Sequence, residues 1–269
     1  MKLSVITINL NNKDGLQQTI DSVVGQTFVD YEFIVIDGQS TDGSLDIIEK
    51  NKDNISQWLS EPDTGVYQAM NKGIELAKGE YLYFLNSGDR LYSDLVFEKM
   101  FAGQPQGAFI CGNFYTENRG ELVLNTLYKD RDWTFALYDI YSTYLCHQAF
   151  FIHRSNFEKY GKYSEDLKIS ADWELFLMAI GVHREAVDYR DVDMVIYNQE
   201  GLSSTIGGQF IYQEKKKVAR RRLSVKLADQ LDRMYYLEQN GYVVDTVKNS
   251  GLLSFLVRIY CWLKRSFSH

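Results

Sequence analysis

Polar residues with metal-binding or hydrogen-bonding side chains follow several of the apolar runs in this sequence. The run YLYFL at residues 81–85 stops at Asn86 and reaches a carboxylate at Asp89, with Ser87 and Gly88 between them. Mg²⁺ and Mn²⁺ prefer oxygen ligands, and Mg²⁺ typically takes one or two carboxylates plus the phosphates of a bound ligand. The pattern therefore predicts that Asp89 binds a divalent cation and that Asn86 contacts the ligand beside it.

The same kind of residue recurs at other expected strand ends. Asn9 lies near the end of LSVITINL, Asp37 ends YEFIVID, and Asp63 lies in the loop EPDTG. Turns favour Asp, Asn and Gly for conformational reasons, so each residue taken singly could be a turn residue. Their recurrence at several strand ends favours a shared ligand site.

Two common phosphate cradles are missing from the chain. Neither GxGxxG nor GxxxxGK[ST] occurs, which argues against a nicotinamide-dependent dehydrogenase and against a P-loop enzyme. A crevice lined with carboxylates repels a bare phosphate, so a phosphate-containing ligand needs a bridging cation. Mn²⁺ or Mg²⁺ is therefore the expected cofactor.

The first part of the chain alternates between strand and helix patterns, which predicts a parallel α/β sheet. Ligands of such sheets bind beyond the carboxyl ends of the strands. The helix after residue 37 has Ser40 or Asp42 as its expected cap, and the helix from residue 66 is expected to close at Gly79. The expected strands lie at residues 3–10, 31–37, 56–61 and 80–85, and the expected helices at 14–26, 40–50 and 66–79.

The rest of the chain predicts antiparallel additions to the sheet and a helical tail. The fold class is thus α/β with a mixed central sheet, with one domain at residues 1–205 and a basic helical tail at 206–269. The expected elements are a hairpin at 107–115 and 121–128, a strand at HQAFFIHR, a helix at DWELFLMAIG, two short strands near 186–197, and helices at about 208–240 and 251–267.

Charge is unevenly distributed along the chain. The net charge is −7; residues 209–269 carry 12 basic and 5 acidic residues (+7), which leaves −14 for residues 1–208. This split predicts two surfaces with different partners, and a basic tail could meet nucleic acid or anionic lipid. The three cysteines have unrelated spacings and form no metal or disulfide pattern, which favours a reducing, cytoplasmic setting.

Several motifs in the same order resemble the family 2 glycosyltransferases, which have the GT-A fold. They are SVITINLN, VIDGQSTDGS, EPDTGVYQAMNKGIELAKGEYLYFLNSGD and ISADWEL, and the resemblance covers roughly residues 2–180. It implies transfer of a sugar from a nucleotide-sugar, a UDP-sugar first of all. The QxxRW motif of the processive synthases is absent, which points to one sugar per encounter.

The resemblance also implies roles for individual residues. Two departures from the family pattern are Gly38, where a second aspartate is frequent, and the single carboxylate in NSGD. By resemblance, Asp37 contacts the base of the donor, Asp89 binds the metal, Thr7 and Asn9 line the nucleotide pocket, and Asp63 faces the nucleotide. Asn86 is placed near the sugar or ribose.

An inverting transfer needs a base on the acceptor side. The resemblance assigns this base to Asp172, which is also a good N-cap for the helix that follows, and Glu174 is the substitute candidate. His147 and Gln148 could face the acceptor, although a single histidine at such a position is more commonly a core or edge residue.

The tail has a basic cluster, KKKVARRRLSVK at residues 215–226, and a last apolar helix, GLLSFLVRIYCWLKRSF. No nucleic-acid motif accompanies the cluster, so nucleic acid is not an expected partner. The helix is short for a membrane span and has an arginine in its middle, so it is expected either to lie in the membrane interface or to pack on the domain. The expected location is the cytoplasm, peripheral at the inner face of the membrane.

The sequence therefore predicts an inverting glycosyltransferase that acts on a hydroxyl of a glycan or lipid-linked acceptor in bacterial surface-polysaccharide synthesis. Two alternatives stay open. A metal-dependent nucleotidyltransferase also uses an α/β sheet, but it would normally have a Gly-rich basic loop where this chain has NNKDG. A non-catalytic module that binds a nucleotide-sugar is the other.

Overall fold

The computed structural model of the chain describes residues 1–118, 120–129, 131, 133, 136–143, 145–199, 201 and 206–239. The chain forms two compact units. The first comprises Met1–Arg131, Cys146–Asp172 and Glu185–Gly207, and the second comprises Asp132–Leu145, Trp173–Arg184 and Gly208–His269. The predicted tail at 206–269 thus lies mostly in a unit that also takes two segments from the predicted first domain.

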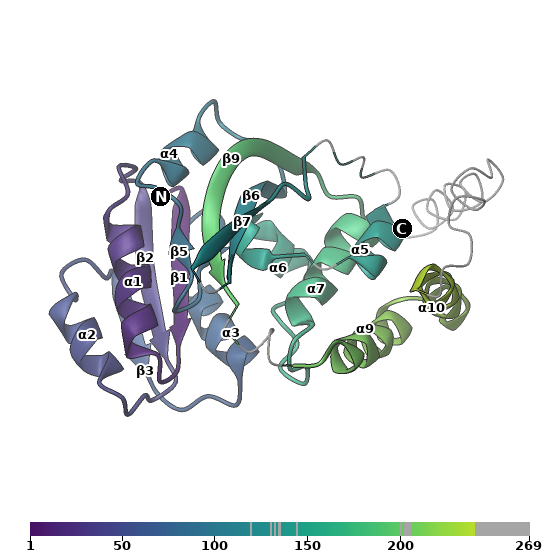
Figure 1. Cartoon of the computed structure of the whole chain (residues 1–269), viewed down its shortest axis with the longest axis horizontal. Coiled ribbons are helices and arrows are strands. Elements are labelled where there is room, and N and C mark those ends of the chain that lie inside the picture. Colours follow the sequence, from purple (N-terminus) through teal and green to yellow (C-terminus); the bar gives the residue numbers. More distant parts are fainter. Residues whose placement is uncertain are drawn as a thin grey trace. The chain divides into compact units, whose positions relative to one another are not determined.

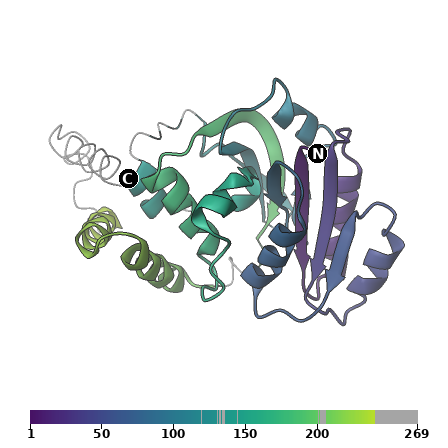
Figure 2. The same cartoon turned by 180° about the vertical axis from the view of Figure 1, so that it is seen from behind.

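The first unit begins with four parallel strands in the order β3-β2-β1-β4. Helices α1 and α2 cover one face of this part and α3 covers the other (Figures 1 and 2). This follows from right-handed crossovers, because the chain continues past β2 to β3 and then returns to the other side of β1. The bounds are β1 Leu3–Asn9, α1 Lys13–Val24, β2 Tyr31–Asp37, α2 Ser44–Lys50, β3 Gln57–Ser60, α3 Val66–Leu76 and β4 Tyr81–Phe84.

The register of the parallel strands brings their polar ends to one edge. Asn9 lies opposite Asp37 across β1 and β2, and Asp37 lies opposite Ser60 across β2 and β3. The preceding residues of β1 and β2 are almost all buried, as expected for strands covered by helices on both faces. The predicted parallel α/β start of the chain is therefore confirmed.

The sheet continues beyond β4 in the order β8-β6-β9-β5, with β7 paired to β6. The β4–β8, β8–β6, β9–β5 and β6–β7 pairs are antiparallel, whereas β6 and β9 run parallel to each other. The predicted hairpin forms between β6 and β7, and the predicted mixed sheet is confirmed. The strands expected near 186–197 are one long strand, β9, which curves strongly (Figure 1) and whose register with β6 shifts around Asn113. The bounds are β5 Arg90–Leu91, β6 Phe109–Asn118, β7 Glu121–Asn125, β8 Phe150–His153 and β9 Val187–Asn198.

Some predicted element ends are wrong. Helix α2 begins at Ser44 after Gly43, because the side chain of Ser40 bonds to Asp37 instead of capping a helix. Asp42 accepts a hydrogen bond from the backbone N–H of Ser44. Helix α3 ends at Leu76, before the expected Gly79. His147–Ala149 form a 3₁₀ turn, η2, that precedes β8 instead of starting it.

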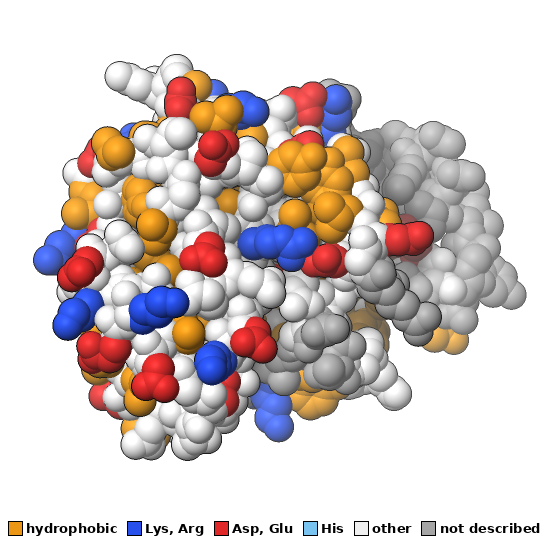
Figure 3. All heavy atoms as spheres, turned by 60° about the vertical axis from the view of Figure 1, so that its left-hand side comes forward, with side chains coloured by type: hydrophobic (Ala, Val, Ile, Leu, Met, Phe, Trp, Pro, Cys, Tyr) orange, Lys and Arg blue, Asp and Glu red, His pale blue; other side chains and the backbone are white. Residues whose placement is uncertain are grey.

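Aromatic side chains fill the core of the first unit around β4 and β8. Tyr83 stacks on Phe151 with ring centroids 4.5 Å apart, and Phe97 and Phe101 meet Phe151 edge-on. Phe97 and Phe101 belong to α4 (Val96–Phe101), and α6 (Ser155–Tyr160) follows β8. On the side of α1 and α2, acidic and basic side chains are interspersed on the surface (Figure 3), so this face has no patch of a single sign.

The second unit is helical in its described part. It contains α5 (Ala136–Ser142), the π-helix η3 (Leu177–Val182), α9 (Gly208–Arg222) and α10 (Val225–Gln239). The chain enters it through α7 (Ala171–Phe176), whose Trp173 donates its indole N–H to the carbonyl of Ile140 at 2.6 Å. The single helix predicted from 208 to about 240 is two helices, with a break at Leu223 and Ser224.

Ion pairs within the second unit neutralise much of the basic cluster at 215–226. Lys216 pairs with Asp232 at 2.6 Å, and Arg220 pairs with Asp229 at 2.8 Å. Two more of its arginines pair with one glutamate, as described below. Among the described residues, no helix has the length and apolar character needed to cross a membrane. The apolar helix predicted at 251–267 lies outside the described residues.

Candidate functional site

Asp37 is the centre of a hydrogen-bond cluster that holds three strand ends together. Its buried carboxylate accepts from Asn9 Nδ2 at 2.8 Å, from the hydroxyl and backbone N–H of Ser40 at 2.6 and 2.9 Å, and from the hydroxyl of Ser60 at 2.7 Å. A carboxylate has about four acceptor positions. The chain's own groups therefore use the hydrogen-bonding capacity of Asp37, which organises the edge of the sheet.

The hydrogen bonds to Asp37 predict a dependence of stability on pH. Burial raises its pKa, but the bonds from Ser40, Asn9 and Ser60 outweigh burial and hold the pKa below its usual value. A carboxylate of this kind stabilises the fold above its unfolded pKa, about 3.9, and this contribution is lost as the pH falls through the folded pKa. We expect the stability advantage of the wild type over Asp37→Asn at pH 7 to shrink below about pH 4. Thermal unfolding of both proteins across pH 3–7 measures it, and a constant difference would contradict this account.

Polar atoms that could bind a ligand lie beside Asp37. Asn9 Oδ1 is buried and has no hydrogen-bond partner in the described part of the chain. A Cβ on Gly38 would lie 2.7 Å from Asp63 Oδ2, so the carboxylate of Asp63 occupies the space beside this glycine. Thr7, in contrast, donates its buried hydroxyl to the carbonyl of Leu85 at 2.7 Å. Asn9 and Asp63 thus keep groups for a ligand, while Thr7 joins β1 to the chain after β4.

A tight turn follows β4 and directs Asp89 inward. Gly88 has a φ of 101°, in the left-handed region that favours glycine, and a Cβ there would lie 3.2 Å from the side-chain nitrogens of Asn12 and Asn198. The hydroxyl of Thr19 accepts from the N–H of Gly88 at 3.0 Å and lies 2.6 Å from the carbonyl oxygen of Asp89. The turn is therefore held from α1.

The carboxylate of Asp89 is buried between two donors. Oδ2 accepts from Gln148 Nε2 at 2.9 Å and Oδ1 from the backbone N–H of Asn198 at 2.9 Å. Burial raises the pKa of Asp89 to about 6, although these bonds oppose the shift. Its sequence neighbour Arg90 pairs with Glu117 at 2.7 Å. A buried carboxylate of this kind is destabilised when charged unless a cation lies beside it.

Asp89 fits the role of a single carboxylate ligand to a divalent cation. Each of its oxygens accepts one hydrogen bond and keeps a second acceptor position. Within the described ranges, no group of three or more His, Cys, Asp and Glu side chains could hold a metal ion by itself. The residues present thus suit a cation that takes its other ligands from phosphates and water.

Asp172, the predicted base, is also buried and hydrogen-bonded on both oxygens. Oδ1 accepts from the hydroxyl of Tyr67 at 2.9 Å, and Oδ2 lies 2.9 Å from His147 Nδ1. Burial and the neighbouring Asp172 raise the pKa of Tyr67 well above its usual value, so Tyr67 stays a donor. Asp172 is therefore fixed in orientation by two side chains.

The adjacent residues His147 and Gln148 connect the two carboxylates. His147 contacts Asp172, and Gln148 donates to Asp89. On its other side, His147 Nε2 lies 3.5 Å from Asn86 Nδ2. Asn86 Oδ1 is buried without a partner in the described part of the chain. Five of the sequence-predicted site residues are thus joined in one series of contacts: Asp89, Gln148, His147, Asp172 and Asn86.

Glu174 has different surroundings, within the second unit. Its carboxylate is 5% exposed and pairs with Arg221 at 2.9 Å and with Arg222 at 2.6 Å. Both of its oxygens are thus occupied by guanidinium groups of the second unit. The geometry therefore favours Asp172 over Glu174 as the acceptor-side carboxylate.

Sequence reasoning missed several residues that position this site, among them Thr19, Asn198, Ser60 and Tyr67. Asn198 and Ser60 end strands β9 and β3, so the strand-end pattern that indicated Asn9 and Asp37 could have found them. Tyr67 lies in α3 and meets Asp172 across 105 positions of sequence, and no local signal indicates this contact.

Comparison with known sequences identifies relatives. Residues 4–161 match the model of "Glycosyl transferase family 2". The chain is 30% identical over 210 residues to a PGL/p-HBAD biosynthesis glycosyltransferase of Mycobacterium bovis, covering 76% of this chain and 79% of the relative. It is 38% identical over 95 residues to the putative teichuronic acid biosynthesis glycosyltransferase TuaG of Bacillus subtilis, covering 34% and 38%.

Solved structures share the fold. TarS residues 1–349 of S. aureus in complex with UDP-GlcNAc has a TM-score of 0.71 at 17% identity, with 97% of this chain and 79% of that one covered. The mannosyltransferase PcManGT of Pyrobaculum calidifontis in complex with GDP-Man and Mn²⁺ has a TM-score of 0.56 at 13% identity, with 99% and 87% covered. The GT-A fold expected from the sequence is confirmed. With most of its sheet within the matched region, the chain is a glycosyltransferase that belongs to glycosyl transferase family 2.

Proposed function

We propose that this enzyme transfers one sugar, with inversion, from a nucleotide-sugar to a hydroxyl of a glycan or lipid-linked acceptor. The observation that carries the proposal is the connection between two buried carboxylates, Asp89 and Asp172, through the adjacent residues His147 and Gln148. Asp89 is suited to bind the charged diphosphate through a cation, and Asp172 is suited to the removal of a proton. An inverting transfer needs these two roles on one site.

The nucleotide-sugar donor is proposed to bind at the edge of the sheet formed by the ends of β1, β2 and β4. A bound Mn²⁺ or Mg²⁺ would neutralise the diphosphate as it leaves the sugar. Asp89 would hold that cation, and Gln148 and Asn198 hold Asp89 in place. Asn86 would contact the sugar or ribose with its unpartnered Oδ1.

Recognition of the nucleotide falls to the strand ends near Asp37. Because the carboxylate of Asp37 is occupied by the chain's own donors, we propose that it shapes the base pocket. Asn9 Oδ1 and Asp63 Oδ2 would then contact the nucleotide, while Asp63 Oδ1 accepts from the N–H of Gly65. Thr7 supports this pocket through its bond to Leu85. UDP is the nucleotide proposed first, and a neighbour with the same fold is known in complex with UDP-GlcNAc.

The acceptor side uses Asp172 and its partners. We propose that Asp172 drives the removal of the proton from the acceptor hydroxyl as this oxygen attacks the anomeric carbon, so that it provides the base function of the site. Relatives named for glycolipid and teichuronic acid biosynthesis support a surface polysaccharide or glycolipid as the acceptor.

A donor panel tests the proposed function. The protein is incubated with UDP-, GDP- and dTDP-sugars in the presence of Mn²⁺ or Mg²⁺, and release of the nucleoside diphosphate is followed. We expect slow, metal-dependent hydrolysis of at least one donor. Release of pyrophosphate from a nucleoside triphosphate and a sugar phosphate would favour a nucleotidyltransferase, and tight binding without turnover would favour a binding module.

We further propose that the tail brings the enzyme to the inner face of the membrane. The sequence of residues 251–267 has the apolar residues that an interfacial helix would need, and each basic residue close to an anionic surface adds about 1 kcal/mol. Because several basic residues at 215–226 are paired within the second unit, the apolar segment carries more of this proposal than the cluster does.

Vesicle sedimentation tests the role of the tail. We expect the full chain to bind anionic vesicles less strongly as salt is raised, and a chain truncated after Asn249 to lose this binding while it keeps donor hydrolysis. Circular dichroism of both chains is the control for folding. Unfolding of the truncated chain would show that residues 250–269 belong to the core and would contradict the membrane role.

A further inference from the structure

We propose that His147 is a catalytic residue of this enzyme: Nε2 receives the proton of the acceptor hydroxyl while Asp172 holds the opposite ring nitrogen. The inference rests on the proposed function and deepens it. It changes the order of the groups on the acceptor side, because the first atom to receive the proton is an imidazole nitrogen and not a carboxylate oxygen.

The geometry around Asp172 is the first support. Its Oδ1 accepts from the hydroxyl of Tyr67 and its Oδ2 faces His147 Nδ1, both at 2.9 Å. The side chains of His147 and Asp172 are 11% and 10% exposed, so solvent does not separate them. Both oxygens of Asp172 thus already have a side-chain partner, and one of these partners is an imidazole ring with a second nitrogen that can receive a proton.

The tautomer of His147 follows from the same contacts. An ionised carboxylate only accepts hydrogen bonds, so the proton of the neutral imidazole lies on Nδ1 and points at Asp172. The lone pair is then on Nε2. A histidine held in this way by an aspartate is the arrangement by which acyl-transfer enzymes make an imidazole a general base.

The direction of Nε2 is the second support. This atom lies 3.5 Å from Asn86 Nδ2, and Asn86 belongs to the turn that ends in Asp89. Nε2 therefore faces the donor side of the site, where it accepts a long hydrogen bond from the amide of Asn86. Asp172 is the carboxylate in direct contact with the ring, so it balances the positive charge that the ring gains in the proposed step.

The proposed step conserves atoms and electrons. The acceptor oxygen forms a bond to the anomeric carbon, and the bond from this carbon to the diphosphate oxygen breaks with its electron pair on that oxygen. The hydroxyl proton moves to His147 Nε2, and the Nδ1–H remains bonded to Asp172. The imidazolium later releases the proton to solvent.

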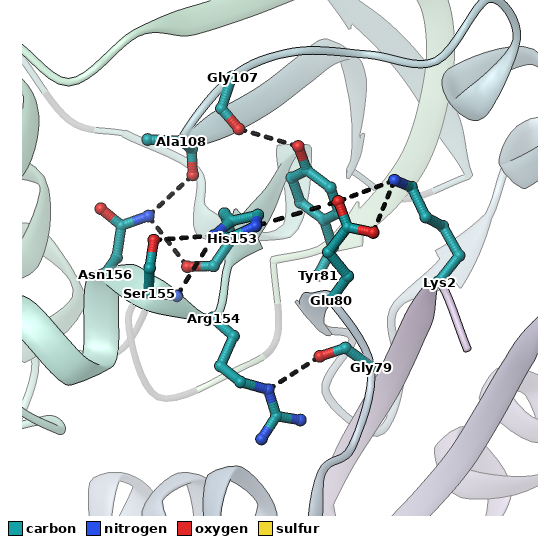
Figure 4. A network of polar contacts seen from close by, with 10 residues as sticks. All are labelled: Lys2, Gly79, Glu80, Tyr81, Gly107, Ala108, His153, Arg154, Ser155 and Asn156. Carbon is teal, nitrogen blue, oxygen red and sulfur yellow. Dashed lines mark hydrogen bonds and ion pairs between the residues drawn. The ribbon is translucent and has the colours of Figure 1, made fainter.

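A second histidine on the same segment provides a matched control. His153 ends β8 and lies opposite Tyr81, at the start of β4, whereas Asn86 and Asp89 follow the other end of that strand. Its Nδ1 bonds to the hydroxyl of Ser155 at 2.8 Å and its ring packs edge-on against Tyr81 (Figure 4). It is one-third exposed and lies 3.9 Å from Glu80, which also pairs with Lys2.

The kinetic test compares His147→Ala with His153→Ala, using donor hydrolysis by water so that no acceptor has to be known. We expect His147→Ala to lose roughly 100-fold or more in turnover, the range of general base catalysis, with little change in donor affinity. Added imidazole should restore activity to His147→Ala. His153→Ala should keep wild-type turnover and not respond to imidazole. Loss without imidazole rescue, or no loss, would overturn the inference.

Coupling between the two residues gives an independent result. Residues that act as one unit are non-additive, so the double variant of His147→Ala and Asp172→Asn should be about as slow as the slower single variant. If the loss of turnover in the double variant equals the product of the two single losses, His147 and Asp172 act independently and the inference is contradicted. ¹⁵N NMR of the wild type, which needs no turnover, should show His147 as the Nδ1–H tautomer, and an Nε2–H tautomer would contradict the inference.

These results separate two failures. A wild type that hydrolyses no donor removes the proposed function and the role of His147 with it. A wild type that turns over a donor while His147→Ala remains equally active removes only the role of His147. If His147→Ala does not fold, His147→Gln and the NMR measurement still decide the question.

Discussion

Asp172→Asn is expected to reduce turnover by roughly 100- to 10,000-fold and to leave donor binding nearly intact. The asparagine can still accept from Tyr67, so the fold should survive. Its amide would donate to His147 Nδ1, which forces the ring proton onto Nε2 and removes the lone pair that faces Asn86 and the donor side. Steady-state turnover, together with calorimetric titration of the nucleotide, measures both parts of this expectation.

Glu174→Gln is the matched control for Asp172→Asn, two residues away on the same helix. It removes the charge that pairs with Arg221 and Arg222, so we expect a less stable protein with turnover close to that of the wild type. The opposite result, with Asp172→Asn active and Glu174→Gln inactive, would reverse the two roles.

Asp89→Ala is expected to abolish transfer and to weaken nucleoside diphosphate binding by at least about tenfold, or about 1.4 kcal/mol. The physical reason is that the only proposed bridge between this chain and the diphosphate is lost when the cation has no carboxylate ligand. Calorimetric titration of UDP with Mn²⁺, and again with a chelator, measures the effect. The chelator should weaken binding to the wild type and have little effect on the variant.

Asp191→Ala is a suitable control for Asp89→Ala. Asp191 lies on β9, the strand that supplies Asn198 to Asp89, but its side chain is 59% exposed and pairs with Lys129. UDP binding should not change in this variant. Binding of UDP that is indifferent both to the chelator and to Asp89→Ala would remove Asp89 from the metal site.

The parallel half of the fold could be predicted because its signals are local. Runs of β-branched and apolar residues give β1 and β2, and the helical spacing of Leu16, Ile20 and Val23 gives α1, whose buried side these residues form. Turn-forming residues or glycines follow the ends of these strands and of this helix. The strand ends that indicated the site, at Asn9 and Asp37, lie opposite one another.

The later elements could not be predicted in detail because polar residues interrupt their patterns for tertiary reasons. Strand β9 reads as two short strands because Arg190, Asp191 and Asp193 lie within it. Some of their partners come from other segments: Asp193, for example, accepts hydrogen bonds from Asn113 and Tyr115 on β6. A single sequence contains no record of such partners.

The site shows the same division between local and long-range information. Strand-end residues are local features, so Asp37, Asn86 and Asp89 could be named from the sequence. His147 and Gln148 could be named as candidates, but their connections to Asp172 and Asp89 depend on contacts 25 and 59 positions apart. The hydrogen bonds that fill the carboxylate of Asp37 were also not foreseen, because Ser40 reads as a helix cap.

The stereochemistry of donor hydrolysis tests the central claim, inverting transfer from a nucleotide-sugar, most directly. The protein is mixed with an α-linked UDP-sugar and Mn²⁺ in an NMR tube, and the anomeric proton of the released sugar is observed before the free sugar mutarotates. A single displacement by water predicts that the β anomer is released first, and that it is absent with Asp172→Asn. Release of the α anomer first would contradict inversion, and the absence of any released sugar with every donor would contradict the proposed function itself.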